Sequence, residues 1–213
     1  GTVRAWDPHL KAALVQQYNL TTETQVATNT SITVAYVGQM GDHLVDPREG
    51  NQRKCPDCPL PVTNLQPDLA AVTNVSYTES EGTMNYNALQ VTGRQHANNG
   101  LELLTSYTFS KTLSNNLGYY GAGGVSSMSA YWQDAYNGQA DYGLAFFDAK
   151  QIFSFAGSYE LPFGRGKLFG GSWNRAEDSL IGGWKLAATA SSHSGFPVTM
   201  SSTEYYHVNQ RTN

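Results

Sequence analysis

The stretch Leu101–Ser110, LELLTSYTFS, alternates between apolar and polar residues. Its odd positions carry most of the apolar side chains: Leu101, Leu103, Tyr107 and Phe109. Because residues i and i+2 of a β-strand share one face, the pattern predicts a strand with one apolar and one polar side. A length of about ten residues is what a tilted strand needs to cross a bilayer.

Five further segments show the same alternation and are predicted to be strands. In Gln151–Glu160, for example, Phe153, Phe155 and Tyr159 share one face. The other predicted strands are residues 16–25, 31–36, 85–95 and 184–189. Six strands of this kind predict an all-β fold, an antiparallel up-and-down transmembrane β-barrel segment.

The connections between these segments alternate between short and long. Short turns are predicted at 27–30 and at 97–100, where Asn and Gly tolerate positive φ. Long outer loops are predicted at about 40–82 and 111–149. Tight periplasmic turns and long outer loops are typical of outer-membrane barrels. The connection at 161–183 is longer than a periplasmic turn needs, and no helical pattern is recognised in it.

The composition excludes several protein classes. Only 14% of residues are charged, against roughly a quarter in soluble domains. Aromatic residues make up 12% and the mean hydropathy is -0.41, values that fit neither a disordered chain nor a helical membrane protein. No run approaches the ~18 apolar residues of a membrane helix. The net charge of -4, without a Lys/Arg cluster, disfavours nucleic acid as a partner.

Cys55 and Cys58 lie in a Cys-Pro-Asp-Cys motif. No βαβ pattern surrounds it to suggest a redox site, and a zinc site would need two further ligands at suitable spacing. The favoured interpretation is a small disulfide-closed loop in an oxidising compartment, with metal or redox chemistry as the lesser alternative.

Several short stretches recur in order along most of the chain: QQYNL at 16–20, VAYVG at 34–38, NYNALQV at 85–91, SYTFSK at 106–111, YELPFG at 159–164, GGW at 182–184 and SGFP at 194–197. Together they resemble the barrel of Oar-like TonB-dependent receptors, which are common in Acidobacteria. The chain departs from that family at 146–151, where FFDAKQ replaces an Asp-Phe-Asp-x-Arg-His run and removes its Arg and His.

The resemblance implies a 22-stranded barrel that normally follows an N-terminal plug. Residues 1–213 are then expected to form a partial barrel domain, a fragment with about six strands and neither plug nor TonB box. The implied location is the bacterial outer membrane. The implied partners are outer-membrane lipid, the remainder of the barrel and plug, the TonB complex and an unidentified solute. The resemblance implies binding and uptake of that solute, without catalysis or cofactor.

Aromatic residues of the second long loop are the candidates for contact with a solute, because they combine a large surface with a polar tip. The candidates are Tyr119, Tyr120, Tyr131, Trp132 and Tyr136. The alternative is that these rings pack the loop or lie at the membrane interface.

The sequence leaves two other functions as alternatives. A small hydrolase is disfavoured because the five His are scattered, no metal-ligand spacing occurs, and Ser192-His193-Ser194 lacks the G-x-S-x-G elbow. Asp134, Asp141 and Asp148 could bind a hard cation, although solvated loop carboxylates are commoner. The stronger alternative is a self-associating β-rich binding or assembly module, because strands without closure partners leave two reactive edges.

Overall fold

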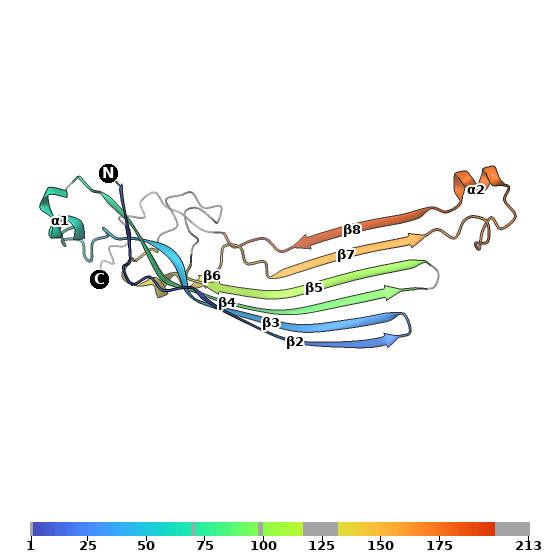
Figure 1. Ribbon diagram of the computed structural model, residues 1–213, viewed down its shortest axis with the longest axis horizontal. Coiled ribbons are helices and arrows are strands. Elements are labelled where there is room, and N and C mark those ends of the chain that lie inside the picture. The colour runs from blue at the N-terminus through green and yellow to red at the C-terminus, as the bar shows by residue number, and fades with distance from the viewer. Residues whose placement is uncertain (1, 70, 98–99, 117–131, 199–213) are drawn as a thin grey trace.

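Six consecutive strands form an antiparallel meander in the computed structural model, which describes residues 2–69, 71–97, 100–116 and 132–198. The strand order β2-β3-β4-β5-β7-β8 pairs each of these strands with the next long strand of the chain, and all six predicted strands are present (Figure 1). Their bounds are β2 Leu14–Ala27, β3 Thr30–Glu49, β4 Asn74–His96, β5 Leu101–Ser114, β7 Gln151–Glu160 and β8 Lys185–His193.

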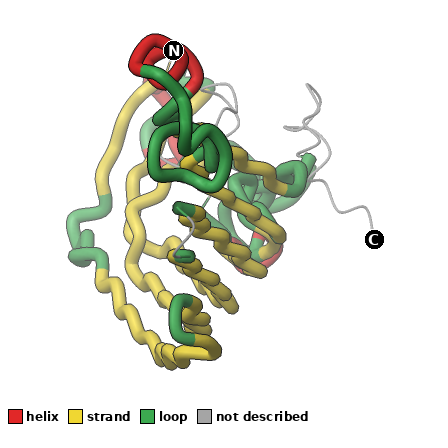
Figure 2. Tube along the Cα trace, turned by 90° about the vertical axis from the view of Figure 1, so that its right-hand side faces the viewer, coloured by secondary structure: helices red, strands yellow, loops and turns green. Residues whose placement is uncertain are grey.

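The sheet is curved and open. Figure 2, which looks along the long axis of Figure 1, shows the strands arranged in an arc. β2 and β8 are the two terminal strands of the meander, and the described residues place no strand beyond either of them. This is the geometry of a section of barrel wall, as the sequence predicts.

The register sets apolar residues of neighbouring strands opposite one another. Leu89 of β4 pairs with Tyr36 of β3 and with Phe109 of β5, while Tyr107 pairs with Phe153 of β7. Directly paired residues share a face of the sheet. These rings and aliphatic side chains therefore form one continuous surface, and all five remain exposed.

The apolar surface has the height of a membrane band. From Leu101 to Phe109 it runs about 27 Å along β5, or about 20 Å across the membrane for the usual tilt of roughly 40°. The opposite face is mostly polar, although Leu104 and Ile152 are exposed on it. Thr92, Ser106 and Ser154 lie in one row across β4, β5 and β7. One face suits lipid and the other suits water, which is the division that a barrel wall requires.

β3 and β4 continue well beyond this band. Asp46 to Glu49 still pair with β4, which begins at Asn74. The predicted loop at 40–82 is therefore wrong at both ends, and the connection comprises residues 50–73, with the short helix α1 (Pro61–Leu65) and the 3-10 turn η1 (Pro67–Leu69). The extensions of β3 and β4 lack the alternation of apolar and polar residues that predicts the other strands, because they lie past the lipid band.

The second long connection also begins later than predicted. β5 extends to Ser114, and the two-residue strand β6 (Gly143–Leu144) pairs with its end, so residues 111–114 and 143–144 are not loop. The connection also contains the 3-10 turn η2 (Gly138–Asp141).

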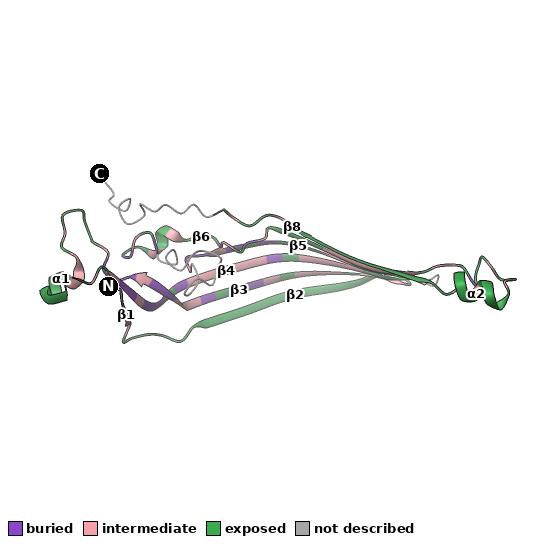
Figure 3. Cartoon of the chain, turned by 90° about the horizontal axis from the view of Figure 1, so that it is seen from above, coloured by how far each residue is buried: buried purple, intermediate pink, exposed green. Residues whose placement is uncertain are grey.

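A short N-terminal strand, β1 (Thr2–Trp6), pairs in parallel with the start of β4. The following residues cross the end of the sheet to reach β2, and on the way the amide of Lys11 donates to Ser80 Oγ at 2.9 Å. Figure 3 shows buried residues gathered where β1, β3 and β4 meet.

The connection between β7 and β8 contains a helix that the sequence analysis missed. α2 (Arg175–Ile181) lies at the end of the sheet opposite the long connections (Figure 1). Asn174 and Glu177 form a capping box at its N-terminus. Seven residues are too few for a helical period to be recognised, but the Asn-x-x-Glu spacing was an available signal.

Candidate functional site

The two long connections are hydrogen-bonded to each other at one end of the sheet, called the outer end below. The side chain of Gln52 donates to the carbonyl of Gln133 at 3.0 Å and accepts from the amide of Ala135. Arg48 of β3 donates to the carbonyl of Ala135 at 3.0 Å. Because these bonds join residues more than eighty positions apart, they give the outer end a defined shape.

Tyr136 is the solute-contact candidate that this arrangement presents to solvent. The residue is 48% exposed, and its hydroxyl donates to the carbonyl of Gln52 at 2.8 Å. The ammonium of Lys54 lies 5.5 Å from the ring centroid. A ring held in place by its hydroxyl keeps an apolar surface available for a ligand.

Trp132 has a different role. It is 5% exposed, and its indole N–H donates to the carbonyl of Asn115 at 2.7 Å. A Cβ atom at Gly138 would lie 2.4 Å from its ring, so only glycine fits there without movement. These contacts support the alternative that Trp132 packs the loop. Tyr119, Tyr120 and Tyr131 lie outside the described residues.

A buried ionic cluster lies beneath these loops, on the extensions of β3 and β4. Arg48 and Glu79 form an ion pair at 2.9 Å, and the Arg48 guanidinium lies over the Tyr77 ring. Asp46 accepts from the amide of Glu81 at 3.2 Å. One carboxylate oxygen of Asp46 and one of Glu79 are buried without a hydrogen-bond partner.

Burial raises the pKa of both acids in this cluster. The pKa of Asp46 rises to about 7, although two backbone amides oppose the change. The pKa of Glu79 also rises to about 7, because desolvation outweighs the attraction of Arg48. The charge of the outer end therefore changes near neutral pH. Sequence analysis missed this cluster, whose residues are thirty positions apart.

A third buried acid, Glu49, organises the start of the first long connection. Glu49 accepts from the amides of Asn51 at 2.9 Å and Val75 at 2.8 Å, and from the side chain of Asn74. Desolvation raises the pKa of its carboxyl. This network turns the chain sharply at the end of β3.

Cys55 and Cys58 form a disulfide within the same connection. Arg53 donates to the carbonyl of Cys58 at 2.9 Å, so the small loop is also held by a hydrogen bond. Both contacts stabilise the conformation of this small loop.

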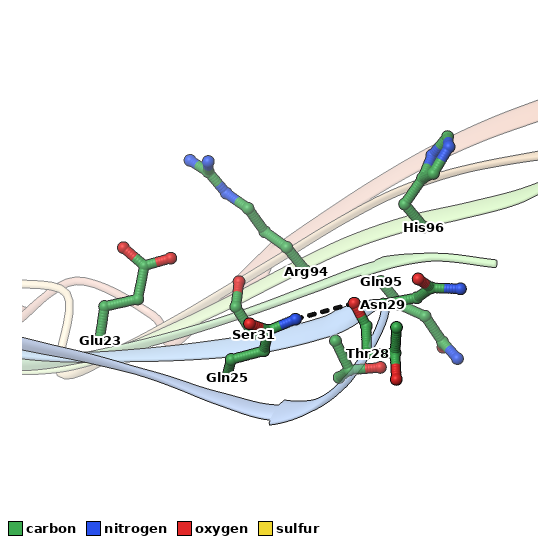
Figure 4. Close-up of a pocket in the computed structure, with 9 residues that line it drawn as sticks. Glu23, Gln25, Thr28, Asn29, Ser31, Arg94, Gln95 and His96 are labelled. Carbon is green, nitrogen blue, oxygen red and sulfur yellow. Dashed lines mark hydrogen bonds between the residues drawn. The ribbon is translucent and has the colours of Figure 1, made fainter.

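The polar face has an open hollow at the opposite end, where the short turns lie (Figure 4). Gln25 donates to the carbonyl of Thr28 there at 2.8 Å. Beside it, Glu102 accepts from Ser158 at 3.0 Å and pairs with Lys185 at 3.4 Å. The hollow is lined by Glu23, Gln25, Thr28, Asn29, Thr30, Ser31, Arg94, Gln95 and His96.

The candidate hydrolase motif and the candidate cation-binding carboxylates make only local contacts. A ring nitrogen of His193 contacts the carbonyl of Ser194 at 2.8 Å, which is not a nucleophile–base pair. Asp134, Asp141 and Asp148 each accept a different backbone amide, from Tyr136, Gln133 and Thr112 respectively.

Metal-binding clusters and membrane-spanning helices are both absent from the described residues. No group of three or more His, Cys, Asp or Glu in them could hold a metal ion. None of the helices in the described ranges is long and apolar enough to span a membrane.

Comparison with known proteins supports the architecture. The profile of a family described as outer membrane beta barrel domain matches residues 1–213. Searches of curated proteins and of solved structures found no match. The match covers the whole chain, and it places the protein in the bacterial outer membrane. This chain belongs to the outer membrane beta-barrel domain family.

Proposed function

We propose that this chain is part of the barrel of a TonB-dependent receptor, which captures a solute at its outer loops and takes it up through the barrel. The whole barrel would contain about 22 strands and a plug, and the TonB complex would supply energy. The six-stranded open meander supports a section of a larger wall.

The arrangement of the outer end is the observation that best supports solute binding. Hydrogen bonds between Gln52 and the segment 133–135 fix the two long connections together. They hold Tyr136 half-exposed beside Lys54, so a ring and a cation face solvent at one place. A surface of this kind suits a solute that has an aromatic or apolar part and a negative charge.

Uptake can be tested in source cells with and without the intact gene. Mass spectrometry of the medium should show a solute that is depleted only by cells carrying the gene. A protonophore should stop the depletion, because TonB-dependent uptake needs energy. Depletion that continues with the protonophore would indicate a passive pore and contradict the proposal, as would identical media from both strains.

The open edges support self-association as a second candidate function. Every residue of β2 is exposed, and the strand pairs on one edge only with β3. An edge of this length is a template for another strand. Sedimentation of the isolated chain in detergent would distinguish the candidates, since a self-associating module forms one discrete oligomer and a wall section forms either monomers or a broad distribution.

A further inference from the structure

The connection between β7 and β8, residues 161–184, is far larger than a strand turn needs. We propose that it is a membrane-surface anchor that binds the anionic phospholipid headgroups of the leaflet next to the short turns. The proposal rests on membership of the outer membrane barrel family and not on the proposed uptake function.

The connection has a defined fold. The amide of Leu161 donates to the carbonyl of Trp184 at 2.8 Å, which closes its base. The amide of Gly164 donates to the carbonyl of Phe169 at 2.8 Å, and the amide of Arg165 donates to the Asp178 carboxylate at 2.7 Å. With the capping box of α2, these bonds fix which side chains point outward.

Large apolar side chains point outward from this folded connection. Leu168 is 80% exposed and Leu180 is 72% exposed. Phe169, Ile181 and Trp184 are also exposed. Several exposed apolar residues on a hydrogen-bonded element indicate an interaction surface.

The apolar surface of the connection is continuous with the lipid-facing surface of the sheet. Leu186 of β8 pairs with Tyr159 of β7, and both lie on the apolar face. Trp184 lies two residues before Leu186, so in the extended chain it faces the same side. Its indole N–H donates to the carbonyl of Leu180, which ties that side to the end of α2. Trp at this depth favours the boundary between hydrocarbon and headgroups.

The charges of the connection favour an anionic partner. The guanidinium groups of Arg165 and Arg175 have no hydrogen-bond or ion-pair partner in the described structure, whereas Lys167 pairs with Glu160 at 3.3 Å. The two acids of α2 bind backbone amides instead of these guanidinium groups. Glu177 belongs to the capping box, and Asp178 accepts from the amide of Arg165. Cations beside an exposed apolar surface are typical of elements that lie on anionic membranes.

The depth of the connection can be measured with a spin label. The full-length protein carrying Leu180→Cys is labelled without reductant, so that the Cys55–Cys58 disulfide stays closed, and is reconstituted in vesicles. Vesicles contain phosphatidylethanolamine alone or mixed with phosphatidylglycerol. The label should be more accessible to oxygen than to a water-soluble nickel complex, and this preference should increase with phosphatidylglycerol. A label at Lys11→Cys, at the outer end, should prefer nickel in both vesicles.

Charge variants distinguish attraction to the anionic headgroups from insertion that is driven only by the apolar side chains. Arg165→Gln with Arg175→Gln should abolish the effect of phosphatidylglycerol, whereas Lys11→Gln, at an exposed position of the outer end, should preserve it. Heat-dependent gel mobility checks that each variant is folded. A label at 180 that prefers nickel would overturn the proposal. Protection from both reagents would also overturn it, because another part of the protein would then cover the surface, and so would an identical result in the two lipid mixtures.

Discussion

Asp46 and Glu79 are direct partners across the β3–β4 ladder, and both side chains are almost completely buried, 1% and 2% exposed. Arg48 neutralises only one of them, through its ion pair with Glu79. Two buried carboxylates beside a single cation are costly when both are ionised. This relationship makes the outer end sensitive to pH.

The stability of the outer end is expected to fall as pH rises from about 4 to about 7. Burial raises the pKa of Asp46 from 3.8 to about 7 and that of Glu79 from 4.5 to about 7. The folded chain therefore binds more protons than the unfolded chain in this window, and the resulting stabilisation is lost as pH passes the folded pKa. The temperature of the gel-mobility shift should be lower at about pH 8 than at about pH 5.

The double variant Asp46→Asn with Glu79→Gln tests the cause. It should reduce the difference in temperature between the two pH values, because the titrating groups are gone. Asp68→Asn removes an exposed carboxyl in η1 and should leave the difference unchanged. An unaltered difference in the double variant would assign the pH dependence to other groups.

Substitution of an apolar-face residue by Arg should destabilise the protein strongly. Tyr107 pairs with Val91 and Phe153 on the lipid face. Tyr107→Arg should cost about 2–4 kcal/mol, because a cation near the middle of the bilayer is poorly solvated. Denaturant unfolding from lipid vesicles measures the loss. Thr108→Arg, one residue away on the polar face, should have little effect. Equal losses for both variants would mean that the two faces are not distinguished by lipid.

Loss of the Trp132 side chain should loosen the second long connection. Trp132→Ala removes a buried ring and should cost about 3–5 kcal/mol locally. Trp132→Phe removes the hydrogen bond to Asn115 and only part of the ring, so it should cost less, about 1–3 kcal/mol. Limited proteolysis within 132–150 should be fastest for Trp132→Ala, slower for Trp132→Phe and slowest for the parent. Trp6→Phe, at an exposed ring, serves as the control. Unchanged proteolysis in both Trp132 variants would argue against a packing role.

Tyr136→Ala should weaken capture of the solute that the uptake assay identifies. The expected loss is about 1–2 kcal/mol in binding free energy, as for an aromatic contact residue. Tyr136→Phe keeps the ring but loses the hydrogen bond to Gln52, so its effect should be smaller. Tyr142→Ala alters another exposed loop ring and is the matched control. Equilibrium binding to whole cells measures all three variants, and equal affinities for Tyr136→Ala and the parent would exclude a contact.

The sequence by itself determined the membrane-spanning part of this protein. Alternation in stretches such as Leu101–Ser110 predicts a strand with one apolar and one polar face, and the turn at 27–30 lies between β2 and β3 as expected. Both signals are local, since a strand exposes alternate residues and a tight turn needs particular side chains. The order of neighbouring strands then follows from short connections.

Only the tertiary structure decided the two ends of the sheet. The polar extensions of β3 and β4 are stabilised by pairing with each other and with β1, not by an apolar face. Contacts such as Gln52 with Gln133 join distant segments, so no local pattern predicts them. Burial of Asp46 and exposure of Leu180 likewise depend on what packs nearby, because a side chain's environment is set by the whole fold rather than by its neighbours in the chain.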